Sequence, residues 1–385
     1  MKSDNITKVI LVGLGSAGKR HLRAIDFYEK RGRLQLVGLV ETDEKMLADF
    51  QSLRRGNLPL PPTATSLEDL YMKLGNTKSP VAHLVAIATP PELHTELSLY
   101  AMDKGADVIV EKPMTLDIKQ AKLLQKQSEI SGRRIFPCLT YRFYPAVKEL
   151  KNFLQSGSFG RILSATATVR WGHDQAYYDG STWLGSWEHE GGALMNQTIH
   201  ALDLIFYLLD ELPQDAMCRL APPYHDIEAA DLAMGIFKLK SGALISIEGS
   251  TLTDPAQKEA GIFLRYEKGT LAAGIRGGKI TYSLTYDDKT IKAPAVVRKS
   301  LKSLIKRDGL GILKHVGKAH TLMYGAILEA LAEWETLDPI VPGDLPTAAE
   351  GLSSLSLVLT LLKAAKTGQI VPYPSEDFEL KDMKV

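Results

Sequence analysis

The chain has 385 residues, of which 45% are apolar and 24% charged, and its formal net charge is +1. This length predicts two domains and this composition a globular protein. The small net charge argues against nucleic acid or an anionic membrane as a partner. We expect no membrane-spanning segment, because no run of roughly 18 uninterrupted apolar residues occurs. The two cysteines, Cys138 and Cys218, lie far apart, which predicts neither a disulfide nor a zinc site and fits a reducing cytoplasm.

The first predicted elements form a dinucleotide-binding motif. Residues 8–15, KVILVGLG, predict a buried strand that runs into glycine, and residues 16–32 predict a helix. The glycines permit a tight turn, close approach of the backbone to a pyrophosphate, and close packing of helix on strand. The apolar run near the N-terminus is short and leads into these glycines. We therefore interpret it as the first strand of this motif rather than as a signal peptide. The motif comprises Gly13, Gly15 and Gly18, with Ser16 and Ala17 inside the loop.

A second strand, residues 34–41, ends at Glu41. A carboxylate at this place accepts hydrogen bonds from the adenosine ribose hydroxyls of NAD. The 2′-phosphate of NADP would bring negative charge against it. We therefore expect NAD as the cofactor rather than NADP.

The alternation of helices and strands continues. A helix is predicted over 66–74, a strand over 81–89, a further helix from about 92 to 105, and a strand in ADVIVEKP. This pattern predicts a doubly wound parallel sheet, with ligands beyond the carboxyl ends of its strands. The candidate cofactor-binding residues at those ends, besides Glu41, are Thr89, Pro90, Glu111 and Lys112.

Five segments together resemble the glucose–fructose oxidoreductase, inositol dehydrogenase and MocA family (Gfo/Idh/MocA). They are VGLGSAGKRH, ATPPELH, VIVEKPMTL, TYRFYP and GGALMNQTIHALDL, in that order. The resemblance implies an α/β architecture with a Rossmann domain over 1–140. Residues 141–385 would form an α+β domain with a large, mainly antiparallel sheet. The C-terminal end of the chain would pack back on the Rossmann domain. It further implies NAD or NADP as cofactor, His94 among the cofactor-binding residues, and a sugar or polyol substrate. The catalytic pair that it implies is Lys112 with His200.

The segment GGALMNQTIHALDLIFYLL, residues 191–209, predicts a helix with an apolar face and a polar stripe of Asn196, His200 and Asp203. Hydride transfer from a secondary alcohol requires a base for the hydroxyl proton, and histidine serves near neutral pH. Lys112 would stabilise the negative charge on the same oxygen, and Asp203 could orient the imidazole. Many family members carry aspartate in place of Asn196, and asparagine can position a hydroxyl but cannot act as a base.

The second domain offers further candidates for substrate binding. Arg142 and Arg170 predict a substrate with a carboxylate or phosphate. The MNQ-x-x-H run is similar to that of a family subset acting on nucleotide-linked or carboxylated sugars. His173-Asp174 and His189-Glu190 lack the spacing of helical metal ligands, so we expect no metal. The candidate substrate-binding residues are Tyr141, Arg142, Arg170, Asn196, Tyr178 and Trp183.

The remaining chain predicts strands over 161–171 and 237–251, and helices over 321–336 and 346–366. Residues 298–307 predict a helix with Lys299, Lys302 and Lys306 on one face. We interpret that face as solvated, although it could reach a nucleotide diphosphate. The family commonly covers the large sheet's outer face with another subunit, and the small residues of SATATV suit this, so we expect a homodimer or homotetramer.

The leading hypothesis is an NAD-dependent dehydrogenase that oxidises a secondary hydroxyl of a sugar or sugar derivative to a ketone. An inositol or free-polyol dehydrogenase is the alternative enzyme. A non-catalytic NAD-binding regulator of the same fold is the alternative of another class, but it has no need of both Lys112 and His200.

Overall fold

The computed structural model describes residues 6–54, 58–75, 80–334 and 345–384. The chain divides into two compact units. The first comprises residues 1–115, 119–140 and 310–352, and the second comprises residues 116–118, 141–309 and 353–385. A boundary falls after residue 140, as the sequence suggested, but residues 310–352 belong to the first unit rather than the second. The reason is that α10 (Ala319–Trp334) packs against α1 (Ser16–Glu29).

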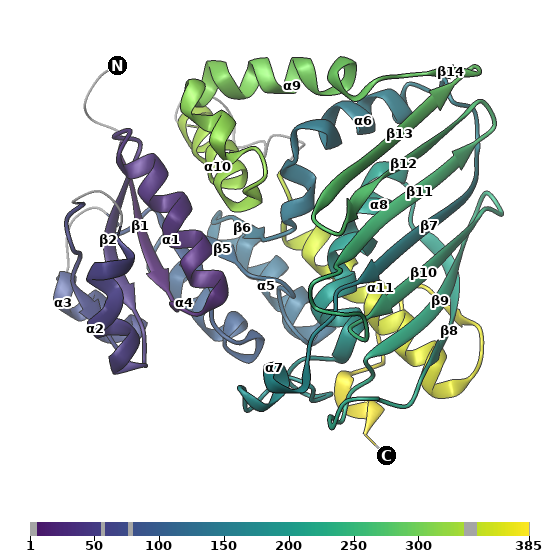
Figure 1. Ribbon diagram of the computed structural model, residues 1–385. Coiled ribbons are helices and arrows are strands. Elements are labelled where there is room, and N and C mark those ends of the chain that lie inside the picture. Colours follow the sequence, from purple (N-terminus) through teal and green to yellow (C-terminus); the bar gives the residue numbers. More distant parts are fainter. Residues whose placement is uncertain (1–5, 55–57, 76–79, 335–344, 385) are drawn as a thin grey trace. The chain divides into compact units, whose positions relative to one another are not determined.

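The first unit contains a six-stranded parallel sheet in the order β3-β2-β1-β4-β5-β6, the arrangement of a Rossmann fold (Figure 1). The middle strands β4 and β5 are buried at every position, which explains why they appear in the sequence as unbroken apolar runs. The strands are β1 (Thr7–Val12), β2 (Leu34–Val40), β3 (Thr63–Ala64), β4 (Leu84–Ile87), β5 (Asp107–Val110) and β6 (Ile135–Pro137).

Helices connect these strands as predicted. The side chain of Asp43 caps α2 by accepting hydrogen bonds from the backbone N–H groups of Lys45 and Met46, which fixes the chain just after β2. The helices of this unit are α1, α2 (Glu44–Leu53), α3 (Leu67–Leu74), α4 (His94–Asp103), α5 (Ile118–Ser131) and α10, with short turns η1 (Pro91–Leu93) and η4 (Leu310–His315). Residues 335–336 of the predicted helix 321–336 lie outside the described residues.

The second unit is built on a nine-stranded sheet in the order β14-β13-β12-β11-β7-β10-β9-β8-β15 (Figure 1). All its neighbouring strands are antiparallel except β7 and β10, which confirms the expected large, mainly antiparallel sheet. The strands are β7 (Ile162–Arg170), β8 (Pro213–Leu220), β9 (Leu232–Leu239), β10 (Leu244–Ser250), β11 (Glu259–Tyr266), β12 (Gly269–Arg276), β13 (Lys279–Tyr286), β14 (Lys289–Thr290) and β15 (Val371–Pro372).

Helices cover one face of this sheet. α8 (Ile199–Leu209) packs on β7 and β11, and Leu361 of α11 (Ala348–Thr367) reaches Gly235 on β9. α11 is long and apolar enough to cross a membrane. However, 67% of its most apolar stretch is buried inside the protein, as in the core helix of a folded domain. The other helical elements are η2 (Thr140–Phe143), α6 (Pro145–Gln155), α7 (Gln175–Asp179), η3 (Leu194–Thr198), α9 (Ala293–Asp308) and η5 (Leu380–Met383).

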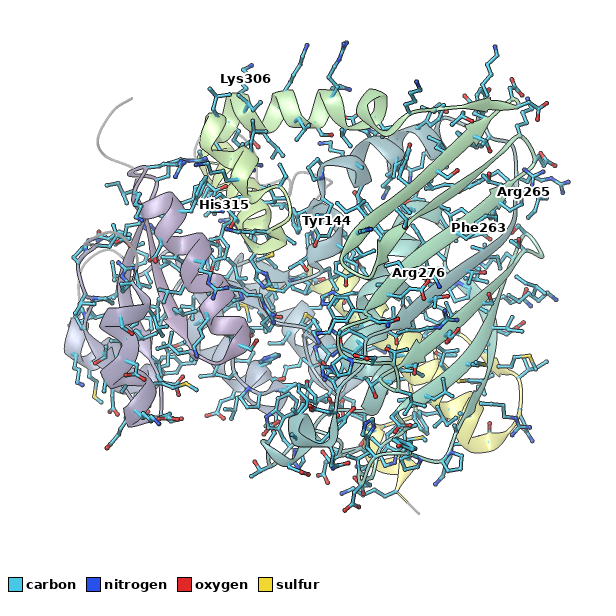
Figure 2. All side chains as sticks on the ribbon, in the orientation of Figure 1. Tyr144, Phe263, Arg265, Arg276, Lys306 and His315 are labelled. Carbon is cyan, nitrogen blue, oxygen red and sulfur yellow. The ribbon has the colours of Figure 1, made fainter. Side chains whose placement is uncertain are left out.

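The basic segment forms the amphipathic helix α9, as predicted. Lys299, Lys302 and Lys306 are exposed, whereas Leu304 and Ile305 are half-buried on the side that packs against α6. Figure 2 shows Lys306 on the side of α9 that faces away from α6. Lys299 also lies 3.8 Å from Glu149 of α6, although its side chain is 82% exposed. The three lysines therefore lie mainly in solvent.

Candidate active site

The glycine-rich turn after β1 has the geometry of a dinucleotide-binding loop. Gly13 has φ +92°, and a Cβ there would lie 2.5 Å from the carbonyl oxygen of Ala88. A Cβ at Gly18 would collide with the carbonyl of Gly13, so both positions require glycine. Nothing lies within 4 Å of the corresponding point at Gly15. The loop thus leaves the backbone at Gly15 and Ser16, where α1 begins, open to a pyrophosphate.

Glu41 lies directly after β2 and beside this loop. One carboxylate oxygen accepts a hydrogen bond from the backbone N–H of Leu14 at 2.6 Å. The other accepts from the N–H groups of Thr42 at 2.7 Å and Asp43 at 3.0 Å. These donors hold the carboxylate at the strand end, where the adenosine ribose of a dinucleotide lies in this fold.

His94 joins the loops that follow β4 and β5. Its imidazole is fully buried, and its ring nitrogens lie 2.9 Å from the carbonyl oxygen of Pro113 and 3.0 Å from that of Thr89. Both nitrogens therefore face backbone, which corrects the expectation that His94 itself binds the cofactor. It positions Thr89, whose buried hydroxyl has no hydrogen-bond partner among the described residues. A ligand commonly satisfies such a group.

Lys112 follows β5, and its peptide bond to Pro113 is cis. The neighbouring Glu111 does not face solvent as a cofactor ligand would. Its carboxylate is buried, and its Oε1 lies 3.3 Å from Nε2 of His21 and 2.8 Å from Nε2 of His320. The two imidazoles hold the pKa of Glu111 well below its usual range, against the effect of burial, which raises it.

The sequence predicted one continuous helix around His200, but the structure shows an interruption. Residues Leu194–Thr198 form the π-helical turn η3, and α8 begins at Ile199. π-helical turns are rare and occur frequently at functional sites. His200 lies immediately after this turn and stacks on the ring of Tyr141, with 4.8 Å between centroids and 20° between planes. Burial raises the pKa of Tyr141 to about 12, so its hydroxyl stays protonated.

Asp203 does not orient His200, contrary to the prediction. Its carboxylate accepts hydrogen bonds from Nε and Nη2 of Arg142 at 2.9 and 2.5 Å and from the hydroxyl of Ser354 at 3.0 Å. The Arg142 and Asp203 side chains are only 7% and 2% exposed. The charge of Arg142 is therefore neutralised inside the second unit.

Arg170 is also paired. Its guanidinium binds both carboxylate oxygens of Glu248 on β10, at 2.7 and 2.6 Å, and Glu259 on β11 at 3.0 Å. Two carboxylates surround one cation. The two arginines thus give no support to the expected preference for an anionic substrate.

Asn196 belongs to a hydrogen-bond network. Its amide donates to Glu190, which is buried and also accepts from the backbone N–H of Gly185 at 2.5 Å. The amide lies 3.5 Å from the hydroxyl of Tyr177 as well. Asn196 therefore ties η3 to the loop over 180–190.

Tyr178 and Trp183, the two aromatic candidates for substrate binding, are not fully exposed. Tyr178 is buried, with its hydroxyl donating to Thr251 at 3.0 Å, and Trp183 is half-buried. His173, which the sequence singled out only as an unsuitable metal ligand, stacks on Tyr177 at 3.7 Å between centroids, and its Nε2 lies 3.2 Å from Nε2 of Gln197. Burial lowers the pKa of His173 to about 4. Its distance from Gln197 along the chain left no signal in the sequence.

The comparison with protein families identifies the class of protein. Residues 7–137 match the oxidoreductase family with an NAD-binding Rossmann fold, and residues 147–272 match the GFO/IDH/MocA C-terminal domain. The two matches cover well over half of the chain, which belongs to the GFO/IDH/MocA oxidoreductase family. The matched residues 7–137, nearly all of them in its first unit, form the NAD-binding Rossmann domain of that family.

Individual relatives narrow the comparison. The chain is 27% identical to the WlbA dehydrogenase of Bordetella pertussis, solved with NADH and UDP-GlcNAcA, with a TM-score of 0.79 and coverage of 97% of this chain and 99% of that one. It is 22% identical to inositol 2-dehydrogenase of Rhodococcus jostii, over 73% of this chain and 71% of that protein. An uncharacterised oxidoreductase of Synechocystis is 28% identical, and there the match spans only about half of each chain, 54% and 52%.

Proposed function

We propose that the protein is an NAD-dependent dehydrogenase that oxidises a secondary hydroxyl of a nucleotide-linked sugar to a ketone. The observation that carries this proposal is the match over nearly the whole length to a dehydrogenase solved with NADH and UDP-GlcNAcA. The open dinucleotide loop and the carboxylate of Glu41 beside it support the cofactor part of this proposal. Lys112 after β5 and His200 on α8 are the residues to which it assigns the chemistry.

NAD, when bound, supplies the acceptor for the hydride that leaves the carbinol carbon. The chain's own residues manage the proton and the charge on oxygen. His200 accepts the hydroxyl proton, and the ammonium of Lys112 donates a hydrogen bond to the same oxygen as negative charge develops on it. Asn196 is uncharged and is held by Glu190, so in this proposal it positions the substrate and takes no proton.

The alternative of an inositol or free-polyol dehydrogenase draws on the inositol 2-dehydrogenase relative. Arg142 and Arg170 are both neutralised by carboxylates, so neither arginine favours one hypothesis over the other. The two hypotheses differ in whether the substrate carries a nucleotide. A screen of UDP-sugars, sugar acids and myo-inositol as substrates, with NADH formation measured by absorbance, distinguishes the two hypotheses.

With the substrate in hand, His200→Ala should lose about 10²- to 10⁴-fold in turnover, which is what a general base contributes. Lys112→Ala should be at least as damaging. His200→Ala should still bind NADH with an unchanged fluorescence titration. Lys104→Ala, an exposed lysine at the end of α4, is the matched control and should keep full activity. Near wild-type turnover in either site variant would show that this mechanism is wrong, and turnover by none of the sugars would favour the regulator.

A further inference from the structure

A compact group of metal-ligating side chains lies within the first unit. His21 lies on α1, Glu111 follows β5, Cys138 follows β6, and His320 lies on α10. Each offers one ligand atom, and these four atoms all lie within 4.8 Å of one another. His21 and Cys138 are fully buried, Glu111 is 7% exposed, and His320 is half-buried. We call these four residues the His–Glu–Cys–His cluster.

Two distances in the cluster approach those of a tetrahedral metal shell, and no two of the ligand atoms lie more than 4.8 Å apart. Glu111 Oε1 lies 3.3 Å from His21 Nε2, and His21 Nε2 lies 3.8 Å from Cys138 Sγ. Ligands bonded to zinc at 2.0–2.3 Å are separated from one another by roughly 3.3–3.6 Å. The contact of 2.8 Å between His320 Nε2 and Glu111 Oε1 is shorter. It would open by about half an ångström around an ion.

The donor types also fit one class of ion. Two imidazole nitrogens, one carboxylate and one sulfur suit zinc and related divalent transition metals, whereas calcium and magnesium take oxygen ligands. A carboxylate and a thiolate together neutralise a divalent charge, which a buried site requires. An outer partner is in place as well, because Nδ1 of His21 lies 2.9 Å from the hydroxyl of Tyr324. Such a partner fixes the tautomer that presents Nε2 to the metal.

We propose that the His–Glu–Cys–His cluster binds one divalent transition-metal ion, zinc above all, as a structural site. Four protein ligands leave no open position for a substrate or water. The ion would tie α1 and α10 to the ends of β5 and β6, and it takes no part in hydride transfer. The chain spacing of the ligands gave no sign of this site, since residues from four separate elements contribute.

The competing interpretation is a hydrogen-bond network without metal, in which Glu111 accepts from His21 and His320. Binding of Co²⁺ distinguishes the metal site from the metal-free network, because only a metal site that contains Cys138 gives a thiolate-to-cobalt charge-transfer band. The full-length protein is freed of metal with a chelator and titrated with Co²⁺, then with Zn²⁺. We expect one Co²⁺ per chain, the visible absorption of tetrahedral cobalt together with the charge-transfer band, and loss of both when Zn²⁺ is added.

Cys138→Ser should remove the charge-transfer band and weaken Co²⁺ binding by about tenfold or more, since even the loss of an outer partner costs that much. Cys218→Ser is the matched control, because Cys218 is the other buried, free cysteine and lies on β8, outside the cluster. It should keep the band. If Cys138→Ser does not fold, His320→Ala serves instead, and it should abolish the rise in unfolding midpoint that Zn²⁺ gives the wild type. Wild-type protein that binds neither ion stoichiometrically, or a band that survives Cys138→Ser, overturns the proposal.

Discussion

At the scale of the single residue, we expect Glu41 to determine which dinucleotide the first unit accepts. Three backbone N–H groups, from Leu14, Thr42 and Asp43, hold its carboxylate at the end of β2. A ribose 2′-hydroxyl can donate to this carboxylate, whereas a 2′-phosphate is repelled by it. We predict that NADH binds at least about tenfold more tightly than NADPH, or about 1.4 kcal/mol. Fluorescence titration with both reduced cofactors measures this difference.

Glu41→Ser should reduce the difference in affinity between NADH and NADPH, mainly by improving the binding of NADPH. Glu44→Ser is the control, since Glu44 is also acidic and close in sequence but lies exposed in the first turn of α2. It should leave the ratio unchanged. Equal or tighter binding of NADPH by the wild type would mean that Glu41 does not meet the ribose.

At the scale of the element, a buried ion pair joins three helical segments of the second unit. Asp203 of α8 binds Arg142 of η2 and Ser354 of α11. Removing one partner of a buried pair leaves an uncompensated charge in the interior. Asp203→Asn should therefore lower the free energy of unfolding by about 3–5 kcal/mol, measured by urea denaturation.

Asp210→Asn is the matched control, because Asp210 lies at the end of the same helix and its side chain is 66% exposed in its pair with Lys151. It should leave the unfolding midpoint nearly unchanged. A variant at Asp203 with wild-type stability and a displaced pH–rate profile would restore the orienting role for His200 that the sequence suggested.

At the scale of the whole molecule, the open face of the large sheet predicts self-association. The strand register places Met217, Ile236, Ser246, Thr166 and Phe263 side by side across five strands. Met217, Ile236 and Phe263 are 47%, 38% and 43% exposed in the single chain, and Phe263 is visible on this sheet in Figure 2. The hydroxyls of Ser246 and Thr166, which lie between these apolar side chains, bind each other at 2.8 Å. Large apolar side chains exposed together on one face mark interaction surfaces. We predict a homodimer or homotetramer formed through this face.

Phe263→Lys should convert the oligomer to monomer at micromolar concentration, because it places a charge on this face, at one end of the row. Light scattering after gel filtration measures the mass directly. Ile280→Lys on β13 is the control. Ile280 is 83% exposed, and it pairs with Ile275, on the other face of the sheet. A wild-type protein that is monomeric at every concentration contradicts this prediction.

The sequence by itself determined the features that depend on neighbouring residues. The strands and helices of the first unit follow from apolar runs and their period. Gly13 and Gly18 follow from a turn that no other residue fits, and Glu41 from its place at a strand end. The mainly antiparallel sheet followed from the resemblance and from alternating strands. These signals are local, so the chain order is sufficient to predict them.

Only the tertiary structure decided which charged side chains meet. Arg142 and Asp203 are 61 positions apart, Arg170 and Glu248 are 78 apart, and Glu111 and His320 are 209 apart. Packing of separate elements fixes such pairs, and a buried charge takes whichever partner the fold brings to it. The same holds for the π-helical turn before His200, because the spacing of apolar residues over 195–209 is also that of a regular α-helix and gives no sign of the extra residue. Arg142 and Arg170, which looked available to a substrate in the sequence, are therefore paired with carboxylates in the folded chain.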